Sequence, residues 1–174
     1  MVSRLDPEKD VATLLRAVPH LVKKHPDARV LIIGDGRERA SLEALATELR
    51  VTENVFFLGE RHEIPALLAQ CEIGVLVPNR SEGLSNTILE YMAAGLPVVA
   101  TDCGGNRELV RDGVTGFIIR SGDSDALADR LNVLLADKEK SRAFGAAGRA
   151  RVEARHQPEA IAAQFAELYC RVAR

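Results

Sequence analysis

The sequence lacks the residue patterns on which disulfide-linked and metal-binding proteins depend. Its 174 residues contain only three cysteines, Cys71, Cys103 and Cys170, which are far apart and in no metal-binding spacing. We interpret them as reduced thiols and expect a cytoplasmic protein. The four histidines form no ligand pattern either. The sequence therefore predicts no metal site and no cofactor.

Long apolar runs and an excess of one charge are also missing. No apolar run approaches the ~20 residues that a membrane-spanning helix needs. The 23 basic and 25 acidic side chains give a net charge of -2, so bulk charge gives no reason to expect binding to nucleic acid or to a membrane surface. Any anion site must therefore be local.

The composition is that of one ordered globular domain. Hydrophobic residues make up 47% and charged residues 28%, and the length fits a single domain over residues 1–174. Met1 and Val2 resemble the end of a strand and lead directly into a turn at 3–7. We therefore expect this sequence to have been cut from a longer chain.

Short apolar runs alternate with helical patterns along the sequence. The predicted strands are 29–33, 55–58, 73–77, 97–100 and 113–119. The predicted helices are 8–24, 37–50, 62–70, 85–94, a short turn at 104–110, 123–136, 138–155 and 158–172. This alternation predicts an α/β, Rossmann-like domain with a doubly wound parallel sheet covered on both faces. Its ligands should bind beyond the carboxyl ends of the strands, where several glycine-containing loops fall.

The stretch 81–100 is the most informative part of the sequence. It places Glu82 in a glycine-containing loop and Glu90 on the following helix, with seven residues between them. Two solvated acids would be the plain structural explanation, because an acid is favoured near a helix N-terminus. The alternative is a ligand site, because backbone N–H groups at a helix N-terminus bind phosphate. The residues that would face the phosphate are Gly83, Leu84, Ser85, Asn86 and Thr87.

Two basic residues near the start of the chain suggest a partner for this loop. We expect a helix to begin at Asp6 or Pro7, with Lys9 in its first turn, where a cation opposes the helix dipole. Local stability therefore does not explain Lys9, although a solvated lysine is common. Together with Arg4 it would form a clamp for a diphosphate, because arginine offers a fork of donors and lysine a point charge.

Several motifs in order resemble the C-terminal, donor-binding domain of retaining GT-B-fold glycosyltransferases of group 1, the group related to sucrose and glycogen synthases. The resemblance covers nearly the whole chain. Its motifs are Arg4 with Lys9, Gly34-Asp35-Gly36, Phe57-Leu58-Gly59, Glu82 with Glu90, 93–101 and 113–117. The spacing of the two glutamates is the most specific of them.

The resemblance implies roles for these positions. Arg4 and Lys9 match the basic pair that neutralises the donor diphosphate, and both are implied to be catalytic. Glu82 matches the acid that contacts the donor sugar, which is often called catalytic, and Glu90 matches the acid that binds the ribose hydroxyls. The loop and helix start at 83–87 match the phosphate site.

The resemblance also extends to Arg61, and it has departures at other positions. Arg61 lies where the family holds the nucleobase, largely through backbone groups. Ser3 and Asp10 stand where the family usually has glycine. We expect Asp10 to attract Lys9 and so to weaken the clamp. The acids Asp123 and Asp125 form the DxD that binds metal in a different glycosyltransferase fold, but we predict that they cap and begin a helix.

The resemblance also implies substrates and partners. The donor would be a UDP-, GDP- or ADP-sugar, and the acceptor a sugar, a lipid or a small molecule. An absent N-terminal domain would hold most of the acceptor site, and the chain alone is expected to be inactive. The segment 158–174 would cross to that domain or mediate a dimer, and the absent domain would supply any attachment at the inner membrane face. The alternatives are a nucleotide-sugar epimerase of the same fold and a non-catalytic nucleotide-binding domain.

Overall fold

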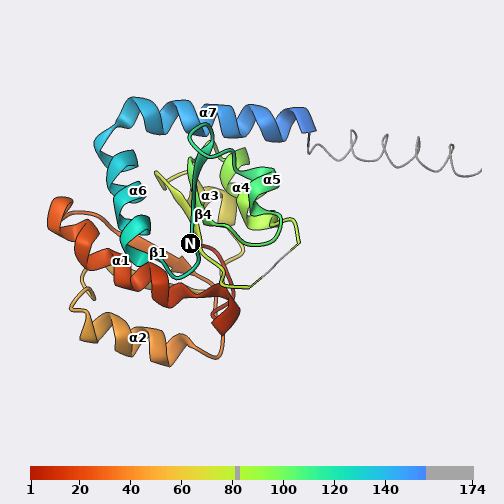
Figure 1. Cartoon of the computed structure of the whole chain (residues 1–174). Helices are drawn as coiled ribbons and strands as arrows, with labels where there is room; N and C mark the ends of the chain where they lie inside the picture. Colours follow the sequence, from red (N-terminus) through yellow and green to blue (C-terminus); the bar gives the residue numbers. More distant parts are fainter. Residues whose placement is uncertain (81–82, 156–174) are drawn as a thin grey trace, which may run out of the picture.

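The computed structural model describes residues 1–80 and 83–155 (Figure 1). The predicted helix at 158–172 and the roles expected for it lie outside these residues. None of the helices in the described part is long and apolar enough to cross a membrane.

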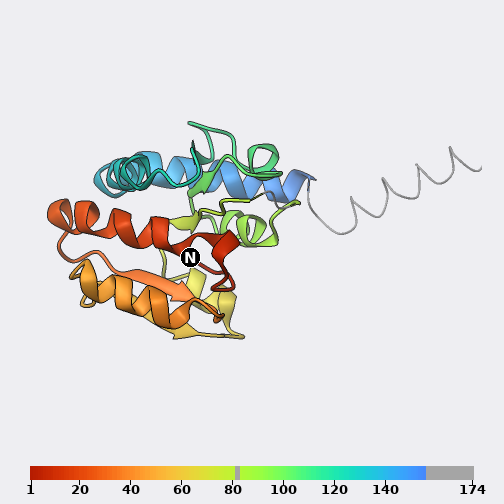
Figure 2. The same cartoon turned by 60° about the horizontal axis from the view of Figure 1, so that its bottom comes forward.

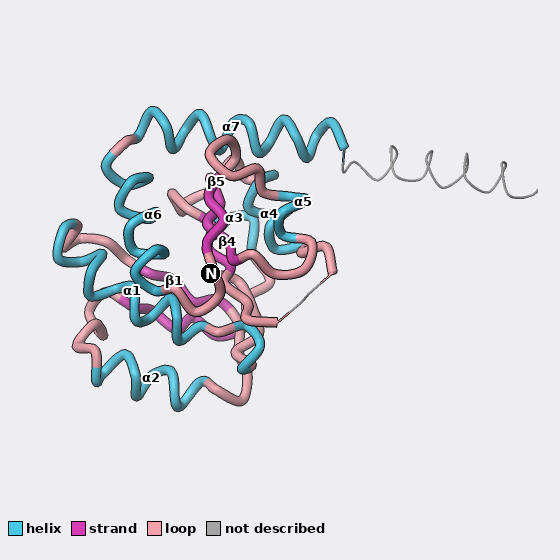
Figure 3. The backbone as a smooth tube through the Cα atoms, in the orientation of Figure 1, coloured by secondary structure: helices cyan, strands magenta, loops and turns pink. Residues whose placement is uncertain are grey.

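The strands form the parallel arrangement that the sequence predicts. The structure contains β1 (Val30–Ile33), β2 (Val55–Gly59), β3 (Gly74–Leu76), β4 (Val98–Thr101) and β5 (Gly116–Ile119). β1 pairs with β2, and the other three pair in the order β3-β4-β5. Every one of these pairs is parallel, and Figure 3 shows the strands enclosed by helices. The predicted α/β class is confirmed.

The first five residues extend along β1 as an additional parallel ladder. Val2 forms a parallel bridge with Ile33. The Ile33 amide donates to the Met1 carbonyl at 2.9 Å, and the Ser3 amide donates to the Ile33 carbonyl at 3.0 Å. Leu5 continues the pattern with a bond of 2.9 Å to the Asp35 carbonyl. Val2 thus pairs with β1 through an isolated bridge, and the prediction that Met1 and Val2 end a strand stays a prediction.

Helices cover both faces of the strands (Figures 1 and 2). They are α1 (Val11–Lys24), α2 (Arg39–Glu48), α3 (Ile64–Leu68), α4 (Asn86–Ala93), α5 (Asn106–Leu109), α6 (Ser124–Ala136) and α7 (Lys138–Arg155). Val99 and Phe117 pack in the core with α1 and α6, whereas Val98 and Ala100 pack in a second core with α4. This alternation follows from the two-residue period of a strand and shows that the sheet is buried on both sides.

The predicted helix at 8–24 was wrong in its first turn. Residues Pro7–Lys9 form a 3-10 turn, and the α-helix begins only at Val11. Asp10 separates the two because its backbone is left-handed, with φ 46° and ψ 47°. Its carboxylate accepts hydrogen bonds from the Thr13 hydroxyl at 2.7 Å and from the Thr13 amide at 3.3 Å. Aspartate tolerates this conformation and is a favoured helix N-cap, so it ends the turn and starts the helix.

Glycines allow α7 to pack closely on the chain that follows α4. A Cβ atom on Gly145 would lie 2.0 Å from the Gly95 carbonyl oxygen, so no side chain fits there. A Cβ atom on Gly148 would meet the Met92 side chain at 3.4 Å, which is an ordinary contact. Both glycines are buried on α7, but only Gly148 leaves room for a side chain.

These two positions predict opposite effects of the same substitution. Gly145→Ala should lower the free energy of unfolding by roughly 1–3 kcal/mol, because α7 must move away from a backbone carbonyl. Gly148→Ala should be neutral or raise it by up to about 1 kcal/mol, because alanine favours the helix. Urea unfolding of both variants checks this. Equal effects of the two substitutions would show that Gly145 does not control the packing of α7.

Candidate functional site

The carboxyl ends of the strands are tied together by the loop that follows β3. The Asn79 amide donates to the Glu8 carbonyl at 3.0 Å, and the Asn79 side chain donates to the Pro7 carbonyl at 3.0 Å. The Pro78 carbonyl accepts from the Thr101 hydroxyl at 2.7 Å, at the end of β4. Asn79 therefore fixes the turn that carries Lys9 at the same edge of the sheet from which the chain runs toward α4.

A basic cluster, defined here as Arg4, Lys9 and Arg37, lies around that turn. Arg4 is 2.9 Å from the Asp6 carboxylate and 3.8 Å from the Glu8 carboxylate. Arg37 approaches the same two acids at 3.7 and 3.8 Å. The structure therefore brings the predicted Arg4 and Lys9 together and adds Arg37, which sequence reasoning missed because its contacts bridge distant segments.

The charges of this cluster affect one another. Partial burial lowers the pKa of the Lys9 ammonium, and the positive charge of Arg4 lowers it further. The carboxylates of Glu8 and Asp6 act in the opposite direction. The Arg4 side chain is 70% exposed, and exposed ion pairs contribute only about 0–1 kcal/mol. An incoming phosphate can therefore replace these carboxylates as the partner of Arg4 at little cost.

Asp10 caps α1 as well as following Lys9. The carboxylates of Glu8 and Asp6 raise the pKa of Lys9, and the Asp10 carboxylate binds Thr13 at the start of α1. The expectation that Asp10 weakens the clamp stays a prediction. Its left-handed backbone also explains why glycine suits this position. Ser3, the other departure, has a buried hydroxyl for which the described residues provide no hydrogen-bond partner.

The start of α4 forms the second part of the site. Ser85 is buried and caps the helix, because its hydroxyl accepts from the Ile88 amide at 3.4 Å. A Cβ atom on Gly105 would lie 3.3 Å from the Gly83 carbonyl, so the two loops lie against each other. Leu84 is 55% exposed, and a Cβ atom on Gly83 would meet no atom within 4 Å. Within residues 1–80 and 83–155, the loop into α4 is therefore open at Gly83 and Leu84.

Glu90 lies one turn into α4 and is exposed, as are Asn86 and, in part, Thr87. The neighbouring Tyr91 points the other way, into the core. Burial raises the pKa of its phenol, which accepts from the Val2 amide at 2.6 Å and donates to the Val75 carbonyl at 3.3 Å. Glu82, the other acid of the predicted pair, lies outside the described residues.

Arg61 stays apart from the basic cluster and from the start of α4. It is exposed in the loop after β2, and its charge acts on the nearby Glu63, whose pKa is lowered mainly by backbone hydrogen bonding. The structure does not bring Arg61 into contact with the other predicted site residues among those it describes.

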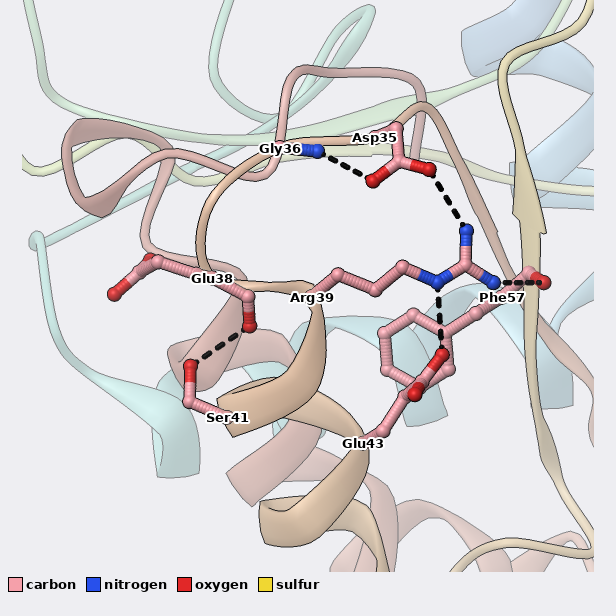
Figure 4. A network of polar contacts seen from close by, with 7 residues as sticks. All are labelled: Asp35, Gly36, Glu38, Arg39, Ser41, Glu43 and Phe57. Atoms are coloured by element: carbon pink, nitrogen blue, oxygen red, sulfur yellow. Dashed lines mark hydrogen bonds and ion pairs between the residues drawn. The ribbon is translucent and has the colours of Figure 1, made fainter.

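An arginine that the sequence did not single out binds β2, the strand that precedes the loop of Arg61 (Figure 4). Arg39 donates to the Phe57 carbonyl at 3.3 Å and pairs with Asp35 at 3.1 Å and with Glu43 at 2.9 Å. The chain ends of β1 and β2 also meet directly, because the Gly34 amide donates to the Gly59 carbonyl at 2.8 Å. The four-residue spacing of Asp35, Arg39 and Glu43 was the available sequence signal for this network.

The DxD motif formed by Asp123 and Asp125 lies at the start of a helix. The Asp123 carboxylate accepts from the Ala126 amide at 2.9 Å, which confirms the prediction that it begins α6. Over residues 1–80 and 83–155, no three histidine, cysteine, aspartate or glutamate side chains gather as metal ligands would.

Comparison with known proteins decides the family. The family model described as "Glycosyl transferases group 1" matches residues 1–151. The chain belongs to this family. Its fold is that of one half of a GT-B glycosyltransferase: the crystal structure of Anabaena HepE in complex with UDP matches with a TM-score of 0.92 and 32% identity, over 97% of this chain and 47% of that one.

Other members of the group 1 family differ in the reactions for which they are named. A GDP-mannose-dependent monoacylated alpha-(1-6)-phosphatidylinositol monomannoside mannosyltransferase of Corynebacterium glutamicum is 40% identical over 87% of this chain and 41% of its own length. N-acetyl-alpha-D-glucosaminyl L-malate synthase of Bacillus anthracis is 31% identical over 99% of this chain and 45% of its own. The chain thus spans less than half the length of these group 1 relatives.

The double role of Asp10 predicts a difference between two substitutions. Asp10→Ala should lower the free energy of unfolding by about 2 kcal/mol, because alanine loses the cap and is strained in the left-handed conformation. Asp10→Gly should cost at least about 1 kcal/mol less, because glycine adopts that conformation without strain. Thermal and urea unfolding measure both. Equal losses would contradict the proposed contribution of the backbone.

Proposed function

We propose that this chain is the donor-binding part of a glycosyltransferase and that it binds a nucleoside-diphosphate sugar between the basic cluster and the start of α4. The observation that carries this proposal is the double hydrogen bond of Asn79 to the Pro7–Lys9 turn. It holds the cations at the edge from which the chain enters α4. The likeness to a HepE structure that contains UDP supports a nucleoside diphosphate as ligand.

The diphosphate is assigned to Arg4, Lys9 and the loop and helix start at 83–87. The exposed guanidinium of Arg4 supplies a fork of donors, and the half-buried ammonium of Lys9 interacts more strongly with a phosphate than a fully solvated one would. The first N–H groups of α4 have no partners within the helix and suit phosphate oxygens.

The two ends of the donor are assigned to the acids and to the loop after β2. Glu90 is exposed one turn below the helix start, where its carboxylate can accept from two ribose hydroxyls. Glu82 is assigned to the hydroxyls of the donor sugar. The nucleobase is assigned to the loop of Arg61, which follows β2, and Arg39 binds the Phe57 carbonyl within that strand.

The reaction proposed for the full-length protein is transfer of the sugar with retention at the anomeric carbon. The bond from the anomeric carbon to the phosphate oxygen breaks, the acceptor hydroxyl oxygen bonds to that carbon, and the hydroxyl proton is released. Negative charge develops on the departing diphosphate, where the basic cluster and the start of α4 would stabilise it. The rest of the polypeptide would supply most of the acceptor site.

Nucleotide binding tests the assignment directly. Isothermal titration of UDP, GDP and ADP should detect binding of at least one of them. Glu90→Ala and Lys9→Met should each raise its dissociation constant roughly tenfold or more, because each removes a hydrogen bond to or from a charged group. Glu153→Ala is the control, because Glu153 pairs with Arg149 on α7.

Two results would overturn the proposal. One is the absence of binding by all three nucleotides at millimolar concentration. The other is an affinity that Glu90→Ala and Lys9→Met leave as unchanged as the control does.

A further inference from the structure

The loop that carries Arg37 is fixed to Leu5 by backbone contacts. The Leu5 amide donates to the Asp35 carbonyl at 2.9 Å, and the Glu38 amide donates to the Leu5 carbonyl at 2.9 Å. A Cβ atom on Gly36 would lie 2.6 Å from that carbonyl oxygen, so the two backbones are in close contact. Arg37 is therefore held beside the residues that lead into the 3-10 turn, without any contribution from its own side chain.

Arg37 and Arg4 pair with the same two carboxylates through different oxygen atoms. Arg4 lies 2.9 Å from Oδ2 of Asp6 and 3.8 Å from Oε1 of Glu8. Arg37 lies 3.7 Å from Oδ1 of Asp6 and 3.8 Å from Oε2 of Glu8. Each carboxylate would therefore keep one oxygen beside Arg37 if Arg4 turned away.

The two acids need a cation beside them for different reasons. The Asp6 side chain is only 16% exposed, and a mostly buried carboxylate is disfavoured when it loses its counter-charge, because little water replaces the lost partner. Glu8 is 36% exposed, but its charge would still repel a phosphate that had taken its place beside Arg4. Both acids would oppose a bound diphosphate unless a second cation stayed with them.

We propose that Arg37 is a positioning residue of the diphosphate site, which retains the carboxylates of Asp6 and Glu8 when Arg4 turns to a bound diphosphate. This role rests on the proposed function, in which Arg4 and Lys9 bind the diphosphate. It requires no contact between Arg37 and the ligand. Arg37 lowers the cost of transferring Arg4 from the acids to the phosphate, and it offsets the repulsion between the acids and the phosphate.

The acids distinguish this role from a direct contact of Arg37 with the phosphate. If Arg37 acts through the acids, its removal should weaken binding only while they are charged. If Arg37 binds the phosphate itself, its removal should weaken binding at least as much when the acids are neutral, because no carboxylate then competes for its guanidinium. A double-mutant cycle between Arg37 and the two acids separates the two cases.

The cycle is measured by isothermal titration with whichever of UDP, GDP and ADP binds the unaltered chain most tightly. Arg37→Met should raise its dissociation constant about threefold to tenfold at low salt, because two carboxylates then compete for Arg4 and repel the diphosphate. In an Asp6→Asn/Glu8→Gln background the same substitution should change the dissociation constant by less than about twofold. The background suits the test because the Asp6 side chain makes no capping hydrogen bond.

Two further variants identify the positive charge as the cause. Arg37→Lys should restore most of the affinity that Arg37→Met loses, because lysine keeps a cation beside the acids. Arg149→Met is the matched control, since Arg149 is an exposed arginine that pairs with Glu153 at 2.9 Å on α7. This control should leave the dissociation constant unchanged.

Salt provides a readout that a purely structural role of Arg37 would not change. The loss of affinity caused by Arg37→Met should shrink as the ionic strength rises from about 20 to about 300 mM, because the Debye length falls from about 20 Å to about 6 Å. A displaced loop would weaken binding at both ionic strengths.

The inference fails on either of two results. An equally large effect of Arg37→Met in the Asp6→Asn/Glu8→Gln background would assign Arg37 to the phosphate itself, and no effect in either background would remove it from the site. The proposed function survives both results if Lys9→Met still weakens binding. The absence of binding by all three nucleotides would overturn the inference and the proposed function together.

A smaller cycle keeps the inference testable if the Asp6→Asn/Glu8→Gln chain does not fold. Glu8→Gln alone changes a side chain that is 36% exposed, and it should reduce the effect of Arg37→Met on the dissociation constant. Strictly additive effects of Glu8→Gln and Arg37→Met would contradict the proposed role.

Discussion

The parallel ladder between residues 1–5 and β1 is the constraint on which the arrangement of the site depends. It carries the chain from Met1 to Leu5 along β1 and releases it at the carboxyl edge, where Arg4 and the Pro7–Lys9 turn follow. The approach is so close that a Cβ atom on Gly34 would lie 2.0 Å from the Ser3 carbonyl oxygen. Glycine after β1 is therefore a condition for placing the cations, and the same loop brings Arg37 to Asp6 and Glu8.

The site gathers several charged side chains in a protein that is nearly neutral overall. Arg4 and Arg37 face the carboxylates of Asp6 and Glu8 around a short turn, and Asn79 anchors that turn through backbone carbonyls rather than through charge. The position of the turn therefore does not depend on the ion pairs. The two Asn79 hydrogen bonds can remain in place when a carboxylate loses its arginine partner to a ligand. Arg39 has a comparable role at the ends of β1 and β2, where it binds a carbonyl as well as two acids.

Much of the fold could be predicted because its signals are local. Apolar runs gave all five strands, and the N-cap character of Asp123 separated a helix start from a metal motif. The error at 8–24 has the same origin, because an apolar period does not reveal that Asp10 is left-handed. The anchoring contacts of Asn79, Arg37 and Arg39 escaped prediction for another reason. Each joins residues whose proximity exists only after the strands have paired.

The sequence by itself determined the alternation of strands and helices, the order of the site motifs and hence the family, because these depend on neighbours along the chain and on residue type. The tertiary structure alone decided that Arg4 and Arg37 share two acids, that the Asp10 carboxylate caps α1, and that Asn79 anchors the Pro7–Lys9 turn. These features arise from hydrogen bonds and contacts between segments far apart in sequence. Such contacts form only when the whole domain packs, so they cannot be read from a local sequence pattern.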